Sequence, residues 1–132
     1  MILHEEVAII SFRMHLFMKY VINKLKFLLL KYMEIEHTYI VYIVACKDWS
    51  YYIGITNDLE KRLWEHNTGQ DKNSYTYSRR PVELKYFETF ADVNQAIARE
   101  KQLKGWSRKK KQALIAENFN RLKELAKSKN QK

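Results

Sequence analysis

Four side chains capable of acid–base or phosphate chemistry recur at regular intervals between residues 42 and 66. Tyr42 and Tyr52 are ten residues apart, Arg62 follows after ten more, and His66 comes four residues after Arg62. Residues four apart share one face of a helix, so Arg62 and His66 can contact one ligand together. The guanidinium stays protonated, and its fork fits phosphate oxygens. The spacing therefore suits an anion-binding site.

Two short strands and a helix must position these side chains. The runs HTYIVYIVAC (37–46) and YYIGIT (51–56) are rich in Tyr, Ile and Val and flank the turn KDWS, which predicts a β-hairpin. Asn57, with a glutamate three residues later, predicts the N-terminal cap of a helix that ends at Gly69. A site near Tyr52 would then also lie close to the positive end of the helix dipole.

The rest of the pattern predicts an α+β domain. GQDKNSYTYSRR (69–80) is typical of a polar loop, and VELKYFETF (82–90) predicts a third strand. Asp92 and Ser107 each precede a helical pattern, and the second pattern continues beyond Asn118 into a charged end. We expect a small three-stranded antiparallel sheet flanked by helices, with an extra N-terminal helix.

Residues 1–33 are distinct from this domain. They are rich in Ile, Leu, Phe and Lys, and basic residues interrupt every apolar run, so none reaches the ~20 residues needed to cross a bilayer. Stable membrane insertion is not expected. The segment is interpreted as a basic amphipathic extension that is dispensable for function, since Met33 is an internal candidate start. Residues 34–118 are predicted to form the main domain, and 119–132 a basic C-terminal helix or tail.

The net charge of +9 is concentrated at one end of the chain. Residues 99–132 carry twelve Lys or Arg against three Glu, which accounts for the whole excess. Such a basic block is expected in a protein that binds polyanions, because neutralised phosphates release counterions. A solvated, lysine-rich helical tail is the alternative.

Cysteine and histidine usage excludes several kinds of site. With Cys46 as the single cysteine, no internal disulfide can form, which favours a reducing, cytoplasmic location. Four dispersed histidines give no zinc site of usual spacing. Any metal would be a hard ion held by carboxylate.

The motifs resemble those of the GIY-YIG nuclease superfamily. IVY ends at Tyr42, YIG occupies 52–54 at the family's usual separation, and Arg62 stands at the place of the family arginine. The resemblance covers about residues 37–116 and is closest to the small, single-domain bacterial branch. It implies a divalent-metal-dependent endonuclease that hydrolyses phosphodiester bonds in DNA, with RNA not excluded.

The resemblance also implies roles for individual residues. Either Tyr42 or Tyr52 would act as the general base; a free tyrosine is only ~0.1% ionised at neutral pH, so a pKa near 8 requires ~2.7 kcal/mol of phenolate stabilisation. Arg62 would neutralise phosphate charge, and His66 would be a proton donor or auxiliary base. Glu100 would hold Mg²⁺ (or Mn²⁺) through one carboxylate.

Basic residues outside these motifs would follow the nucleic-acid backbone without reading sequence. They lie in the polar loop and after Ser107: Lys72, Arg79, Arg80, Arg108, Lys109 and Lys110. An alternative is a basic DNA- or RNA-binding module with the same fold and no catalysis. A third reading is a membrane-surface protein held by its N-terminal helix.

Overall fold

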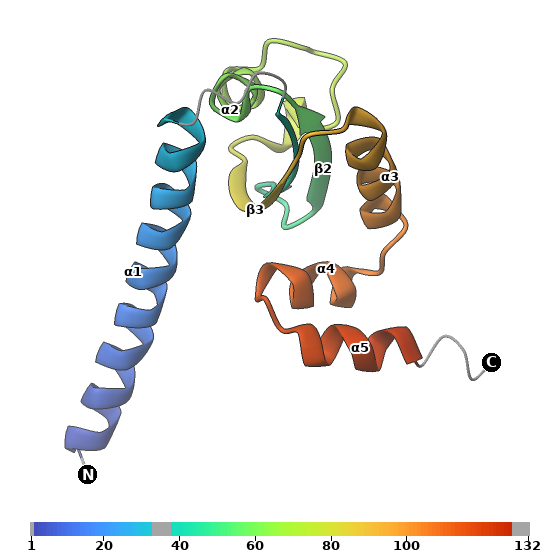
Figure 1. Cartoon of the computed structure of the whole chain (residues 1–132). Coiled ribbons are helices and arrows are strands. Elements are labelled where there is room, and N and C mark those ends of the chain that lie inside the picture. Colours follow the sequence, from blue (N-terminus) through green and yellow to red (C-terminus); the bar gives the residue numbers. More distant parts are fainter. Residues whose placement is uncertain (1, 33–37, 128–132) are drawn as a thin grey trace. The chain divides into compact units, whose positions relative to one another are not determined.

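The computed structural model describes residues 2–32 and 38–127, in two units that comprise residues 1–36 and 37–132. The first unit is the helix α1 (Ile2–Tyr32; Figure 1), and most of its large apolar side chains between Val7 and Leu29 are exposed. No described helix combines the length and hydropathy of a membrane span. The predicted boundary at residues 33 and 34 lies outside the described residues.

The second unit is built on a three-stranded antiparallel sheet, as predicted (Figure 1). Its strands are β1 (Tyr39–Ala45), β2 (Tyr51–Thr56) and β3 (Glu83–Phe90), in the spatial order β2-β1-β3. The central strand β1 is almost wholly buried, which explains its continuous run of Tyr, Ile and Val. In the ladder, Tyr42 lies opposite Gly54.

The two faces of the sheet carry different chemistry. One face packs against the helix α3 (Val93–Lys104) through a cluster of buried apolar side chains: Val41, Ile43, Ile53, Ala96, Leu103 and Leu114. Because side chains alternate along a strand, Tyr42 and Tyr52 point to the opposite face. That face is covered by the helix α2 (Leu59–Thr68), since a side chain of α2 reaches the Tyr42 hydroxyl.

Helix α2 begins one residue later than the sequence predicted. Asp58, and not Asn57, is the N-cap, with an extended backbone and a carboxylate that accepts from the backbone N–H of Lys61 at 3.0 Å. The Thr56 hydroxyl accepts from the N–H of Asp58 and donates to its carbonyl, both at 3.1 Å, which moves the start of the helix by one position. Gly69 ends α2 in the left-handed conformation, as predicted.

The C-terminal helical pattern is two helices and not one. Ser107 caps α4 (Arg108–Ile115), as predicted, but Glu117 adopts a left-handed conformation with φ of 55° and breaks the helix. The chain resumes as α5 (Phe119–Lys127), where the Asn118 side chain accepts from the backbone N–H of Arg121 at 3.1 Å. Helices α4 and α5 pack against each other (Figure 1). The prediction for residues 128–132 lies outside the described residues.

Candidate active site

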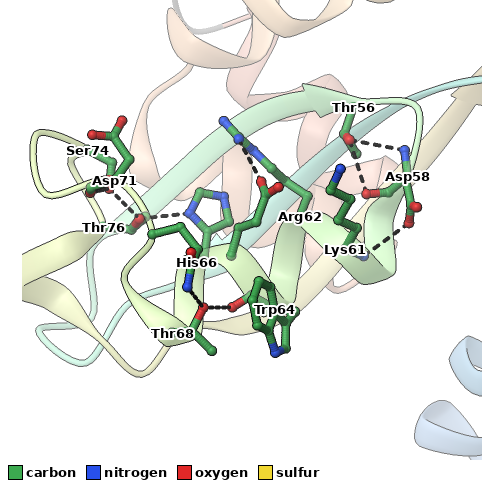
Figure 2. A network of polar contacts seen from close by, with 12 residues as sticks. Thr56, Asp58, Lys61, Arg62, Trp64, His66, Thr68, Asp71, Ser74 and Thr76 are labelled. Carbon is green, nitrogen blue, oxygen red and sulfur yellow. Dashed lines mark hydrogen bonds and ion pairs between the residues drawn. The ribbon is translucent and has the colours of Figure 1, made fainter.

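Tyr42, Tyr52, Arg62 and His66 come together on the α2 side of the sheet. The Tyr42 hydroxyl and Nε2 of His66 are 2.7 Å apart, and the ring centroid of Tyr52 lies 6.3 Å from that of Tyr42 and 5.2 Å from that of His66. Arg62 stands one turn before His66 on α2, on the same side of the helix (Figure 2). Three elements of the chain thus contribute to one cluster.

Tyr42 and His66 are both held in their neutral forms. Tyr42 is completely buried, and burial raises its pKa to about 12 against the opposing effect of the nearby Arg62 guanidinium. Burial, and then the positive charge of Arg62, lowers the pKa of His66 below its ordinary value. At neutral pH both members of this hydrogen-bonded pair therefore carry no charge.

Gly54 makes room for the buried tyrosine. A Cβ atom at this position would contact the hydroxyl oxygen of Tyr42 and would lie 2.5 Å from Cζ and 2.9 Å from Cε1 of its ring. The ring of Tyr42 therefore lies directly over the backbone of β2. The glycine of the YIG motif is required here for close approach.

Tyr52 is the more accessible of the two tyrosines, and it is part of a stack of side chains. It is half-buried, and its ring stacks on that of Tyr75 with centroids 6.2 Å apart and planes inclined by 19°. The guanidinium carbon of Arg79 lies 3.8 Å from the centroid of Tyr75. Arg79 is in turn held by an ion pair with Asp48, from Nε to Oδ2 at 3.1 Å.

Arg62 retains hydrogen-bonding capacity in this environment. Its Nη1 donates to Oε2 of Glu65 at 3.1 Å (Figure 2). Its Nε is buried and has no hydrogen-bond partner within the described part of the chain. A buried donor without an acceptor is uncommon in folded proteins and often marks a place where another group binds. Because the Arg62 side chain as a whole is 43% exposed, this open donor belongs to a guanidinium that an anion can reach from solvent.

A family model for the GIY-YIG catalytic domain matches residues 38–113, a range that contains every residue of this cluster. The chain belongs to the GIY-YIG family. A UPF0213 protein of Bacillus pumilus is 48% identical over 82 residues, which is 62% of this chain and 83% of the relative. A UPF0213 protein of Staphylococcus saprophyticus is 49% identical over 77 residues, 58% of this chain and 93% of the relative. Among solved structures, the solution structure of protein EF2693 from E. faecalis is 33% identical, covers 66% of this chain and 92% of its own, and has a TM-score of 0.47.

Glu100, the metal ligand implied by the GIY-YIG resemblance, lies on α3, the helix that packs against the buried apolar cluster. Its carboxylate is 16% exposed and forms an ion pair with Nζ of Lys104 at 2.5 Å. Within the described part of the chain, its ion pair is with Lys104 and not with Arg62. Residues 2–32 and 38–127 contain no group of three or more His, Cys, Asp or Glu side chains able to hold a metal. One carboxylate fits Mg²⁺ when water completes the octahedron, as this ion tolerates.

The predicted nucleic-acid-binding residues of this GIY-YIG domain differ in exposure and in their contacts. Lys72 and Lys109 are exposed, as required for backbone contacts. The arginines make internal contacts: Arg80 lies over the ring of Tyr77 and donates to its carbonyl, and Arg79 is held by Asp48.

Arg108 and Lys110, the other two predicted nucleic-acid-binding residues, contact the hairpin turn and Trp106. Arg108 donates to the carbonyl oxygen of Trp49 at 2.7 Å, while the backbone N–H of Lys47 donates to the carbonyl of Arg79 at 2.9 Å. Lys110 lies over the ring of Trp106, with Nζ 5.8 Å from its centroid. Arg108 thus also joins α4 to the β1–β2 turn.

Two members of the site were missed by the sequence analysis. Thr76 is completely buried, and its hydroxyl lies 2.8 Å from Nδ1 of His66 (Figure 2). Tyr75 stacks on Tyr52. Both stand in the segment that reads as a polar loop, just before a short 3₁₀ helix (Tyr77–Arg79). A threonine in such a run carries no periodic signal of burial.

Proposed function

We propose that this GIY-YIG domain is an endonuclease that hydrolyses phosphodiester bonds in DNA, led by contacts with the phosphate backbone. The observation that carries the proposal is the convergence of two tyrosines, a histidine and Arg62, whose Nε is a buried donor without a partner among the described residues. Phosphodiester hydrolysis requires an activated water and neutralisation of the charge that develops on the phosphate. The cluster contains residue types for both tasks.

Tyr52 is the better candidate for the group that accepts a proton from water. The Tyr42 hydroxyl is fully buried, is hydrogen-bonded to His66, and has a pKa raised to about 12 by burial. A phenol in that state is a poor base and is inaccessible to water. Tyr52 is partly exposed and packs edge-to-face against the same histidine ring. Tyr42 would then act by holding His66 and Arg62 in place.

Arg62 would bind the scissile phosphate through the donors that Glu65 leaves available. Glu100 would hold Mg²⁺ (or Mn²⁺) through its carboxylate after displacement of the Lys104 ammonium. When bound, such an ion supplies charge neutralisation at the phosphate and its leaving oxygen. Lys72 and Lys109, which are exposed, would follow the DNA backbone.

The test is cleavage of branched, flapped and nicked DNA by the full chain, with Mg²⁺ and with a chelator. Arg62→Ala should lower the rate on the order of 10²-fold or more, as for other donors to a developing negative charge. Arg121→Ala is a matched control, because Arg121 also pairs with a glutamate three residues on, at 3.0 Å, but lies on α5. It should cleave like the wild type. Glu100→Gln, with the exposed Glu124→Gln as control, tests the metal ligand in the same assay.

The alternative function gives a different result in these experiments. A non-catalytic nucleic-acid-binding module would shift the same substrates in a gel and leave them intact with Mg²⁺ present. Equal cleavage by Arg62→Ala and Arg121→Ala would show that a different site, or a contaminant, is responsible. Either result would remove the proposal.

A further inference from the structure

A chain of hydrogen bonds leads from a backbone carbonyl in the loop after α2 to the hydroxyl of Tyr42. The Ser74 hydroxyl donates to the carbonyl oxygen of Asp71 at 2.9 Å, and it lies 3.3 Å from the Thr76 hydroxyl. The Thr76 hydroxyl lies 2.8 Å from Nδ1 of His66, whose Nε2 is 2.7 Å from the Tyr42 hydroxyl. The loop part of this chain is visible beside His66 in Figure 2.

The donor in each of these hydrogen bonds can be assigned, because the series ends at the Asp71 carbonyl, which can only accept. A carbonyl oxygen can only accept, so the single hydroxyl proton of Ser74 is used on Asp71. Between the two hydroxyls, the Thr76 hydroxyl must then be the donor. With its own proton directed to Ser74, Thr76 can only accept from His66.

This direction determines the tautomer of the imidazole. A neutral histidine carries one N–H, and Thr76 requires that it be on Nδ1. Nε2 is then an acceptor, and the Tyr42 hydroxyl donates to it. Both Thr76 and His66 are buried, with exposed fractions of 0% and 6%. With the opposite tautomer, these buried groups would lose a hydrogen bond that water could not replace.

We propose that Thr76 is a positioning residue that holds His66 in the Nδ1–H tautomer and thereby directs the hydroxyl proton of Tyr42 toward Nε2. The Tyr42 oxygen then presents only lone pairs to its remaining neighbours. One of these is the guanidinium of Arg62, which has donors and no acceptor. Through His66, Thr76 therefore keeps the Tyr42 oxygen an acceptor on the side of the neighbouring guanidinium.

The tautomer can be measured without any assumption about activity. In the uniformly ¹⁵N-labelled full chain at neutral pH, long-range ¹H–¹⁵N correlation spectra distinguish a protonated from an unprotonated imidazole nitrogen. The His66 signals are those lost in His66→Gln. We expect a protonated Nδ1 and an unprotonated Nε2. A neutral His66 protonated on Nε2 would overturn the proposal, and this measurement requires no variant of Thr76 to fold.

Variants of Thr76 then test whether this residue sets the tautomer. Thr76→Val keeps a β-branched shape but removes the hydroxyl, so Nδ1 loses its acceptor and the proton should move to Nε2. Thr76→Ser should retain the wild-type signals. Thr68→Val is the matched control, since the Thr68 hydroxyl is exposed, donates to the carbonyl of Trp64 and accepts from the side chain of Gln70, away from His66. An unchanged tautomer in folded Thr76→Val would contradict the proposed role.

The catalytic consequence rests on the proposed function and is separated from it by the same variants. Cleavage by Thr76→Val should fall on the order of 10-fold, as for other residues that orient a catalytic group through a hydrogen bond, and Thr76→Ser should restore it. If the wild type cleaves DNA and Thr76→Val cleaves equally well, the positioning role fails while the nuclease function stands. If the wild type cleaves nothing but shows the Nδ1–H tautomer, the proposed function fails and the hydrogen-bond chain stands.

Discussion

Replacement of Gly54 by alanine should place a methyl group in space that the ring of Tyr42 occupies. The new Cβ would meet the hydroxyl oxygen and would lie 2.5 Å from Cζ of that ring. The ring has no room to retreat, because Tyr42 is 0% exposed and its hydroxyl is hydrogen-bonded to His66. We therefore expect Gly54→Ala to be strongly destabilising.

Two effects contribute to the magnitude. Insertion of a methyl group into a well-packed core costs ~1–3 kcal/mol. If the ring moves away instead, the hydrogen bond to His66 breaks and leaves a buried polar group unpaired, at a cost of ~1–3 kcal/mol. We expect a loss of about 2–4 kcal/mol in the free energy of unfolding. For a domain of this size, that corresponds to a decrease of roughly 10–30 °C in Tm.

Urea and thermal denaturation of the variant and the wild type measure this effect. Gly105→Ala is the matched control, because its φ is −78° and the nearest atom to its added Cβ would be the carbonyl oxygen of Gln102 at 3.5 Å. That variant should lie within about 0.5 kcal/mol of the wild type or be slightly more stable. In a Tyr42→Leu background, the cost of Gly54→Ala should shrink, since the ring is absent. Equal stabilities of Gly54→Ala and the wild type would refute the packing argument.

Three further predictions concern stability. Because burial lowers the pKa of His66, its contribution to stability is present above the unfolded pKa of ~6.5 and decreases as the pH falls through the folded value. Urea denaturation between pH 7 and 5 should therefore show a smaller decrease for His66→Gln than for the wild type; parallel curves would contradict this. Trp49 has φ of 65° and is 75% exposed, so Trp49→Gly should be about 1 kcal/mol more stable than Trp49→Ala in the same assay, and equal values would exclude backbone strain at this turn. Burial opposes ionisation of Glu88, but hydrogen bonds from Arg99 and Tyr86 hold its pKa below the ordinary value. Glu88→Gln should cost ~1–3 kcal/mol, against less than ~0.5 kcal/mol for the exposed Glu124→Gln, and the reverse order would show that the Arg99 pair is not stabilising.

The sequence was sufficient for the parts of the fold that depend on local pattern. The hairpin around Tyr42 and Tyr52 was predicted because both strands are β-branched or aromatic almost throughout and a polar turn separates them. The sequence also indicates that Tyr52 lies near Arg62 and His66, because α2 begins directly after β2. Tyr42, Tyr52 and His66 lie in mutual contact, and the joint action of these three side chains with Arg62 stays a prediction.

Features that no local sequence pattern indicates were not predicted. The burial of Thr76 results from its hydrogen bond to His66, ten residues away, and no periodic pattern accompanies it. The break at Glu117 was missed because the left-handed conformation there is adopted without the usual glycine or asparagine. The place of Glu100 relative to the tyrosines stays a prediction, since its ion pair joins it to Lys104 on its own helix.

The turn between β1 and β2 is tied to two distant segments of the domain. Arg108 donates to the carbonyl of Trp49, Asp48 pairs with Arg79, and the N–H of Lys47 donates to the carbonyl of Arg79. Surface turns of this kind are ordinarily where related chains gain or lose residues most freely. Here one added residue would pull the Trp49 carbonyl or the Asp48 carboxylate out of register with its partner. The turn therefore has an obligatory length, and a variant that lengthens it would have to replace all of these contacts together.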